Sequence, residues 1–120
     1  MQHRVFINSD NFIEAQIIGD IGLSEIAKLG QQVVNNITLL EENGRKINIL
    51  IDYSKGTKTE EFGIALSKSI AKNLKFNKIA GFAANEETTK VIEEVNKAAG
   101  SENKIRLFKT RSEAEAWLKE

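Results

Sequence analysis

The residues best suited to chemistry follow a short apolar segment in the middle of the chain. The segment Ile47–Ile51 ends in the carboxylate of Asp52, and a polar stretch follows it, made of Tyr53, Ser54, Lys55, Gly56, Thr57, Lys58 and Thr59. A helical pattern then opens with Glu60 and Glu61. Carboxylates and hydroxyls between a buried strand and a helix N-terminus are the parts of an anion-binding loop or an acid–base site. We therefore expect a working surface between Asp52 and Gly63.

Plainer structural explanations exist for the same residues. Thr57 and Glu60 match a capping box, in which a hydroxyl and a carboxylate satisfy the free amides of a helix start. Acids such as Glu60 and Glu61 are favoured in a first helical turn by the helix dipole. Asp52 can hold a turn by bonding nearby amides. We favour capping over catalysis. The hydroxyls that stay open as phosphoacceptors are Ser54, Thr57 and Thr59, with Lys55 and Lys58 as counter-charges.

The composition excludes several classes of protein. The 120 residues are 41% apolar and 28% charged, as expected for one globular domain over residues 1–120. The 17 basic and 17 acidic residues cancel, whereas a nucleic-acid-binding protein normally has a basic excess. The absence of cysteine excludes disulfides and thiolate chemistry, and a single histidine, His3, disfavours a histidine triad or a multi-histidine metal site. We expect no metal, no cofactor and, since no signal peptide or membrane-spanning run is visible, a cytoplasmic location.

Hydrophobic spacing predicts an α/β fold with the element order β-β-α-β-α-β-α-β-α. The predicted strands cover residues 4–8, 12–19, 47–51, 79–84 and 105–108. The predicted helices run from Ser24 to Asn43, from Phe62 to Leu74, from Asn85 to Ala99 and from Thr110 onward. Alternating strands and helices imply parallel strands, and the opening hairpin adds an antiparallel edge. The expected architecture is a small mixed, mainly parallel sheet with covering helices.

Two segments together resemble a known family. One is the strand-to-loop run Ile49–Ser54; the other is a strand ending in Phe108, a capped turn, and the pattern Glu113-Ala114-x-x-Trp117-Leu118. They resemble the SpoIIAA-like branch of the STAS superfamily, across nearly the whole chain. The resemblance implies a non-enzymatic regulatory module that binds a protein partner, as in anti-sigma-factor antagonists, anion transporters and stress-signalling assemblies. It also implies a fold similar to Sec14-type lipid-binding domains, with an apolar pocket in some members.

The chain departs from the antagonist pattern at one point. Classical antagonists carry Asp-Ser-Ser-Gly at the helix start, and a serine there is phosphorylated. Alignment on Asp52 places Glu60-Glu61-Phe62-Gly63 across that motif, so Glu61 and Phe62 replace both serines. The resemblance thus implies a binding surface without the usual phosphoacceptor. The residues expected on this surface are Asp52, Tyr53, Ser54, Lys55, Thr57, Thr59, Glu61, Phe62 and Gly63.

A carrier for a small lipophilic or membrane-associated ligand is the alternative function. Its pocket would be lined by aromatic residues, although core packing explains their spacing equally well: Phe12, Phe62, Phe76, Phe82, Phe108 and Trp117. Four lysines could meet acidic headgroups or an acidic partner, or form a solvated face: Lys68, Lys72, Lys75 and Lys78. A homodimer through the apolar strand residues Val5 and Ile7 also stays open.

Overall fold

The fold was determined as a computed structural model that describes residues 3–21, 23–59, 76–100 and 104–120. The strands are β1 (Arg4–Ile7), β2 (Ile13–Ile21), β3 (Asn48–Thr59), β4 (Lys78–Phe82) and β5 (Ile105–Phe108). The helices are α1 (Leu23–Glu42), α3 (Glu86–Ala99) and α4 (Arg111–Lys119). The helix predicted from Phe62 to Leu74 lies outside the described residues.

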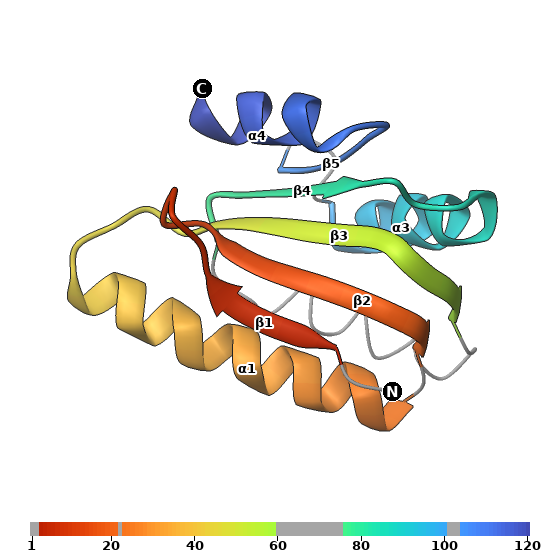
Figure 1. The fold of residues 1–120 in the computed structure, drawn as a ribbon, viewed down its shortest axis with the longest axis horizontal. Helices are drawn as coiled ribbons and strands as arrows, with labels where there is room; N and C mark the ends of the chain where they lie inside the picture. Colours follow the sequence, from red (N-terminus) through yellow and green to blue (C-terminus); the bar gives the residue numbers. More distant parts are fainter. Residues whose placement is uncertain (1–2, 22, 60–75, 101–103) are drawn as a thin grey trace.

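The strands form one sheet in the order β1-β2-β3-β4-β5 (Figure 1). The pair β1–β2 is antiparallel, and the other neighbours are parallel. The structure thus confirms the predicted mixed, mainly parallel sheet that opens with a hairpin. α4 lies on the opposite face of the sheet from α1 (Figure 1).

Alternation along the strands divides the core into two layers, because successive side chains point to opposite faces. Ile49 of β3 belongs to the layer beneath α1, and the neighbouring Leu50 belongs to the layer beneath α4. The first layer contains Ile13, Val33, Ile37, Leu40, Ile47, Ile49, Ile79 and Ile105. The second contains Phe12, Leu50, Ala80, Phe82, Ala114, Trp117 and Leu118. β3 is therefore buried on both faces, as the sequence predicts.

The predicted helix boundaries are confirmed where capping chemistry marks them. The Asn85 side chain accepts a hydrogen bond of 2.7 Å from the Thr88 amide at the start of α3. Gly100 ends α3 in the left-handed conformation, with φ of 63°. At the start of α4, the Glu113 amide donates to the Thr110 hydroxyl at 3.3 Å.

The prediction of a polar loop from Tyr53 to Thr59 is wrong, because β3 continues through these residues. β2 also runs on to Ile21 and supplies the pairing partners, with Ile18 opposite Lys55 and Ile21 opposite Thr59. β4 ends at Phe82, so beyond Asp52 the strand pairs only with β2 within the part of the chain that the structure describes. Thr57 thus lies within a strand and does not cap a helix.

Trp117 anchors α4 to the sheet. Its side chain is buried, and its ring centroid lies 5.7 Å from that of Phe108. The Lys78 amine lies 5.0 Å from the centroid of the indole ring and donates a 3.0 Å hydrogen bond to the Trp117 carbonyl. The assignment of Lys78 to a solvated lysine face is therefore wrong. The other lysines of that predicted face, Lys68, Lys72 and Lys75, lie outside the described residues.

A buried ion pair is the second anchor of α4. Glu14 lies on β2, and its side chain is only 2% exposed. Arg111, the first residue of α4, donates from Nη1 to Oε2 at 3.1 Å and from Nη2 to Oε1 at 2.5 Å. The side-chain amides of Asn8 and Gln16 also donate hydrogen bonds to this carboxylate, each at 3.1 Å. Burial alone would raise the pKa of Glu14, but these hydrogen bonds outweigh it and hold the pKa below its usual 4.5.

We expect Arg111→Met to lower the free energy of unfolding by about 2–4 kcal/mol, because it leaves a buried carboxylate without its cation. Chemical denaturation followed by circular dichroism measures this change. The double variant Glu14→Leu with Arg111→Met should be more stable than Arg111→Met alone, since it removes both charges. A double variant that is less stable would contradict the role given to the pair.

The same pair predicts a pH dependence. Because the pKa of Glu14 is lowered in the folded state, its stabilisation is fully present above pH of about 4.5 and is lost as pH falls through the folded pKa. Glu14→Gln should therefore be less stable than wild type near neutral pH, with the difference shrinking under acid. Melting temperatures of both proteins across this pH range provide the measurement, and a constant difference would contradict the assignment.

Candidate functional site

The sheet register brings Asp52, in the middle of β3, level with the edge at which β4 and β5 end. Asp52 lies opposite Phe82, and Phe82 lies opposite Phe108. The residues that follow, Ala83 and Lys109, therefore leave the sheet next to each other. The carboxyl ends of parallel strands are the usual place for ligand contacts in open α/β sheets.

A β-bulge follows Asp52 on β3. Gln16 of β2 lies opposite Asp52, but Ile18 lies opposite Lys55, so two residues of β3 face one residue of β2. Within the bulge, the Ser54 amide donates to Asp52 Oδ1 at 2.9 Å, which confirms that Asp52 bonds a nearby amide. Ser54 and Lys55 are exposed. Bulges of this kind redirect side chains beside functional sites.

Tyr53 does not lie on the surface, contrary to the expected binding surface. Its side chain is 7% exposed and packs with Ile17 on the α1 face of the sheet. The ring lies so close to Gly81 that a Cβ there would be 2.8 Å from Tyr53 Cε2. Burial raises the pKa of the Tyr53 phenol well above its usual 10.0. The spacing of two residues from Ile51 is the signal in the sequence that places Tyr53 in the core.

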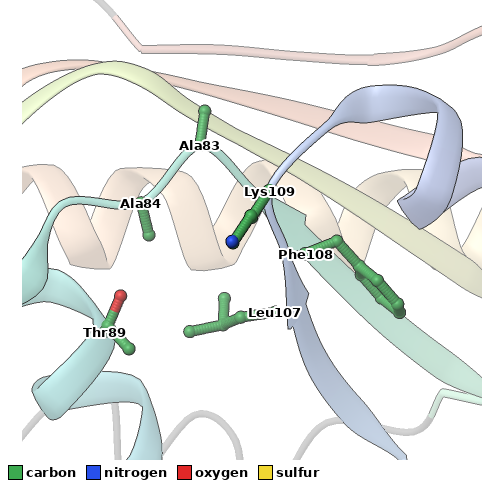
Figure 2. A pocket seen from close by; sticks show the side chains of 6 residues that line it. All are labelled: Ala83, Ala84, Thr89, Leu107, Phe108 and Lys109. Carbon is green, nitrogen blue, oxygen red and sulfur yellow. The ribbon is translucent and has the colours of Figure 1, made fainter.

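An open pocket of about 380 Å³ adjoins this edge, between the ends of β4 and β5 and the start of α3 (Figure 2). Its lining residues are Ala83, Ala84, Thr89, Leu107, Phe108 and Lys109. The Lys109 amine points toward the space between Ala84 and Leu107, whereas the Phe108 ring points away from the other side chains (Figure 2). Ala83 has φ of 59°, a left-handed conformation that is uncommon outside glycine and recurs at functional sites.

The predicted aromatic lining of a lipophilic pocket is mostly core. Phe12, Phe82 and Trp117 are buried beneath α4, and Phe76 packs against the layer beneath α1. Of the described aromatic residues predicted to line a pocket, Phe108 alone lines this one. Phe62 lies outside the described residues.

Cationic side chains surround the edge. Lys55 and Lys109 are exposed, and the Arg111 guanidinium lies 5.8 Å from the Phe82 ring centroid. The hydrogen bond to Glu14 raises the pKa of Arg111 despite partial burial, and the carboxylates of Glu115 and Asp52 add to the effect. Asp52 and Arg111 thus share one electrostatic environment, although they are far apart in the sequence.

The structure describes only some of the residues predicted to form the binding surface. Those that it describes all lie within β3. Asp52, Ser54 and Lys55 lie close to the ends of β4 and β5, and Thr57 and Thr59 lie further along the strand. Glu61, Phe62 and Gly63 lie outside the described residues. Sequence reasoning missed Ala83, Lys109 and the Glu14–Arg111 pair. In the described parts of the chain, no group of three acidic, histidine or cysteine side chains could hold a metal, and no helix is long and apolar enough to cross a membrane.

Comparisons with known proteins identify the family. Residues 12–119 match the SpoIIAA-like family. The anti-sigma factor antagonist SpoIIAA, solved in its unphosphorylated form, is 9% identical, with a TM-score of 0.62 and coverage of 98% of each chain. An uncharacterised protein of the DUF3478 family from Shewanella loihica, with a SpoIIAA-like fold, is 12% identical, with a TM-score of 0.66 and coverage of 98% of this chain and 92% of the other. No curated protein matches the sequence. The chain has a STAS-type fold and belongs to the SpoIIAA-like family.

Proposed function

We propose that this protein is a non-enzymatic regulatory module that binds a protein partner through the carboxyl-end surface, defined by Asp52, Ser54, Lys55, Ala83 and Lys109. The observation that carries the proposal is the β3 bulge, which presents Ser54 and Lys55 to solvent beside the end of β4. The structural similarity to SpoIIAA, an anti-sigma factor antagonist, supports a regulatory role. Exposed polar residues positioned by a β-sheet scaffold are typical of a recognition surface.

The electrostatics of the carboxyl-end surface favour an acidic partner. Lys55 and Lys109 are exposed, and the one carboxylate among the surface residues, Asp52, accepts a hydrogen bond from the Ser54 amide. A partner segment with acidic side chains would therefore be attracted and oriented by the two lysines. We propose such a segment as the docking element.

The groups near this surface give little support to acid–base catalysis. Glu14 is held ionised by Arg111, and Tyr53 is buried with a raised pKa. Neither group is tuned toward neutral pH, where a general acid or base works best. The proposed activity is therefore binding.

We expect the double charge reversal Lys55→Glu and Lys109→Glu to weaken partner binding at least about tenfold, because it replaces attraction by repulsion. The measurement is quantitative recovery of interacting proteins from the native cell extract by tagged protein. The matched control is Lys28→Glu with Lys90→Glu, two exposed lysines on α1 and α3. Equal recovery by both double variants would contradict the proposal.

We further propose that control does not use the family's phosphoacceptor position, since Glu61 and Phe62 replace the serines there. Ser54 is the exposed hydroxyl that remains on the carboxyl-end surface, next to Lys55. The intact mass of protein isolated from its own cells, at rest and under stress, should lack a phosphate increment at residues 60–63, which bear no hydroxyl. An increment that Ser54→Ala abolishes would assign a relocated switch; one that persists in Ser54→Ala and is lost when Thr57 or Thr59 is also replaced by Ala would assign it to that threonine, and one that survives all three changes would contradict control at this surface.

The pocket beside Lys109 favours a second function, the binding of a small ligand. Its volume of about 380 Å³ lies within the range of ligand sites. Leu107 and Ala84 offer an apolar wall, and Lys109 offers a cation. We propose a small ligand with an apolar body and an anionic group, rather than a wholly lipophilic one.

Native mass spectrometry of gently purified protein tests the second function. A bound ligand should appear as an added mass that is reduced by Leu107→Ser and Lys109→Glu. Lys28→Glu serves as the control, since it changes the same charge far from the pocket. A mass retained by both pocket variants, or no added mass and no liposome association, would contradict ligand binding at this site.

A further inference from the structure

The outer edge of β1 has a defined set of free backbone groups. The Asn8 amide donates to the Phe12 carbonyl at 2.9 Å, so this antiparallel pair is hydrogen-bonded. Hydrogen-bonded and non-hydrogen-bonded pairs alternate along an antiparallel ladder. The backbone N–H and C=O groups of Phe6 and Arg4 therefore also point toward β2, where these residues lie opposite Glu14 and Gln16. The N–H and C=O groups of Val5 and Ile7 must then point away from the sheet. They have no backbone partner within the described residues.

Charge protects the opposite edge of the sheet more fully than β1, in which Arg4 is the one charged residue. β5 is flanked or interrupted by Lys104, Arg106 and Lys109, and the Asn96 side chain donates to the Ile105 carbonyl at 3.1 Å. Charges and covering side chains are the usual means of preventing strand pairing at an edge. In β1, the run from Val5 to Ile7 is entirely apolar.

We propose that two copies of this chain pair through β1 in antiparallel orientation, about a two-fold axis between the two Phe6 residues. In this register, Val5 and the partner's Ile7 exchange two backbone hydrogen bonds. The two-fold axis adds the same two bonds between Ile7 and the partner's Val5. The result is one continuous ten-stranded sheet. This proposal is independent of the function proposed for the carboxyl-end surface.

The side chains on both faces of the sheet suit this register. Val5 and Ile7 already pack against the core layer beneath α1 and would extend it into the partner. The two Phe6 rings would meet on the other face, since a non-hydrogen-bonded pair brings side chains close. Arg4 would lie opposite the partner's Asn8, so no like charges face each other across the axis.

The surface of α1 also favours a second copy of this chain as the partner of β1. α1 contacts both β1 and β2, so the two-fold axis would bring two copies of α1 to the same face of the joined sheet. The exposed positions between residues 30 and 40 are all uncharged, in a chain that is 28% charged: Gln31, Gln32, Val34, Asn35, Thr38 and Leu39. Val34 and Leu39 are 41% and 52% exposed. Depletion of charge is the compositional mark of an interface core.

Sedimentation velocity of the full chain, with any tag at the C-terminus, tests the dimer. We expect twice the chain mass of 13.4 kDa, with dissociation on dilution. Ile7→Pro removes an outward N–H without breaking the β1–β2 ladder and should shift the dissociation constant at least about tenfold. Phe6→Glu should have the same effect by placing two carboxylates at the axis. Circular dichroism verifies that both variants are folded.

A single introduced cysteine tests the register, because the chain has none of its own. Phe6→Cys should form a disulfide-linked dimer on mild oxidation, since non-hydrogen-bonded antiparallel pairs meet the required Cα spacing. Arg106→Cys, on the β5 edge, is the matched control and should cross-link much more slowly. A wild-type protein that is monomeric at about 1 mM, a dimer unchanged by Ile7→Pro and Phe6→Glu, or equal cross-linking of both cysteine variants would overturn the proposal.

Discussion

The buried carboxylate of Glu14 is the constraint on which the arrangement of this fold depends. A charge at a position only 2% exposed must be paired, and the pairing cation comes from the first residue of α4. The pair therefore fixes where the last helix begins on the sheet. Trp117, two turns further along α4, completes the attachment by packing on Phe108 and Lys78. The end of β5 and the pocket beside Lys109 are held between these two anchors and the start of α3.

The fold was predictable from sequence wherever the signals were local. Asn85, Gly100 and Thr110 mark helix ends through their own backbone chemistry, and the apolar spacing of Ile47–Ile51 marks a buried strand. The extension of β3 was not predictable, because it depends on the length of β2, more than thirty positions earlier in the chain. Polar residues from Tyr53 to Thr59 resemble a loop until a partner strand supplies their hydrogen bonds.

The candidate site was less accessible to sequence reasoning for the same reason. Asp52, Ser54 and Lys55 could be named because they directly follow the apolar run Ile47–Ile51 in the sequence. Glu14 and Arg111 are 97 positions apart, and nothing near either residue indicates the other. The prediction placed Tyr53 on the surface because its hydroxyl is polar. Its spacing of two and four residues from Ile51 and Ile49 instead places it on their face of the strand, in the core. Side-chain chemistry identified candidates, and strand geometry decided which of them meet solvent.

The overhang of β3 beyond β4 has a consequence for local stability. Among the described residues, the strand from Tyr53 to Thr59 pairs on one side only, which gives this ribbon a lower free energy of opening than the five-stranded part of the sheet. Under the proposed mode of binding, a partner that contacts Ser54 or Lys55 would hold this less stable segment closed, and part of its binding free energy would offset the cost of that ordering. Binding would then protect the ribbon against opening more than it protects the rest of the sheet.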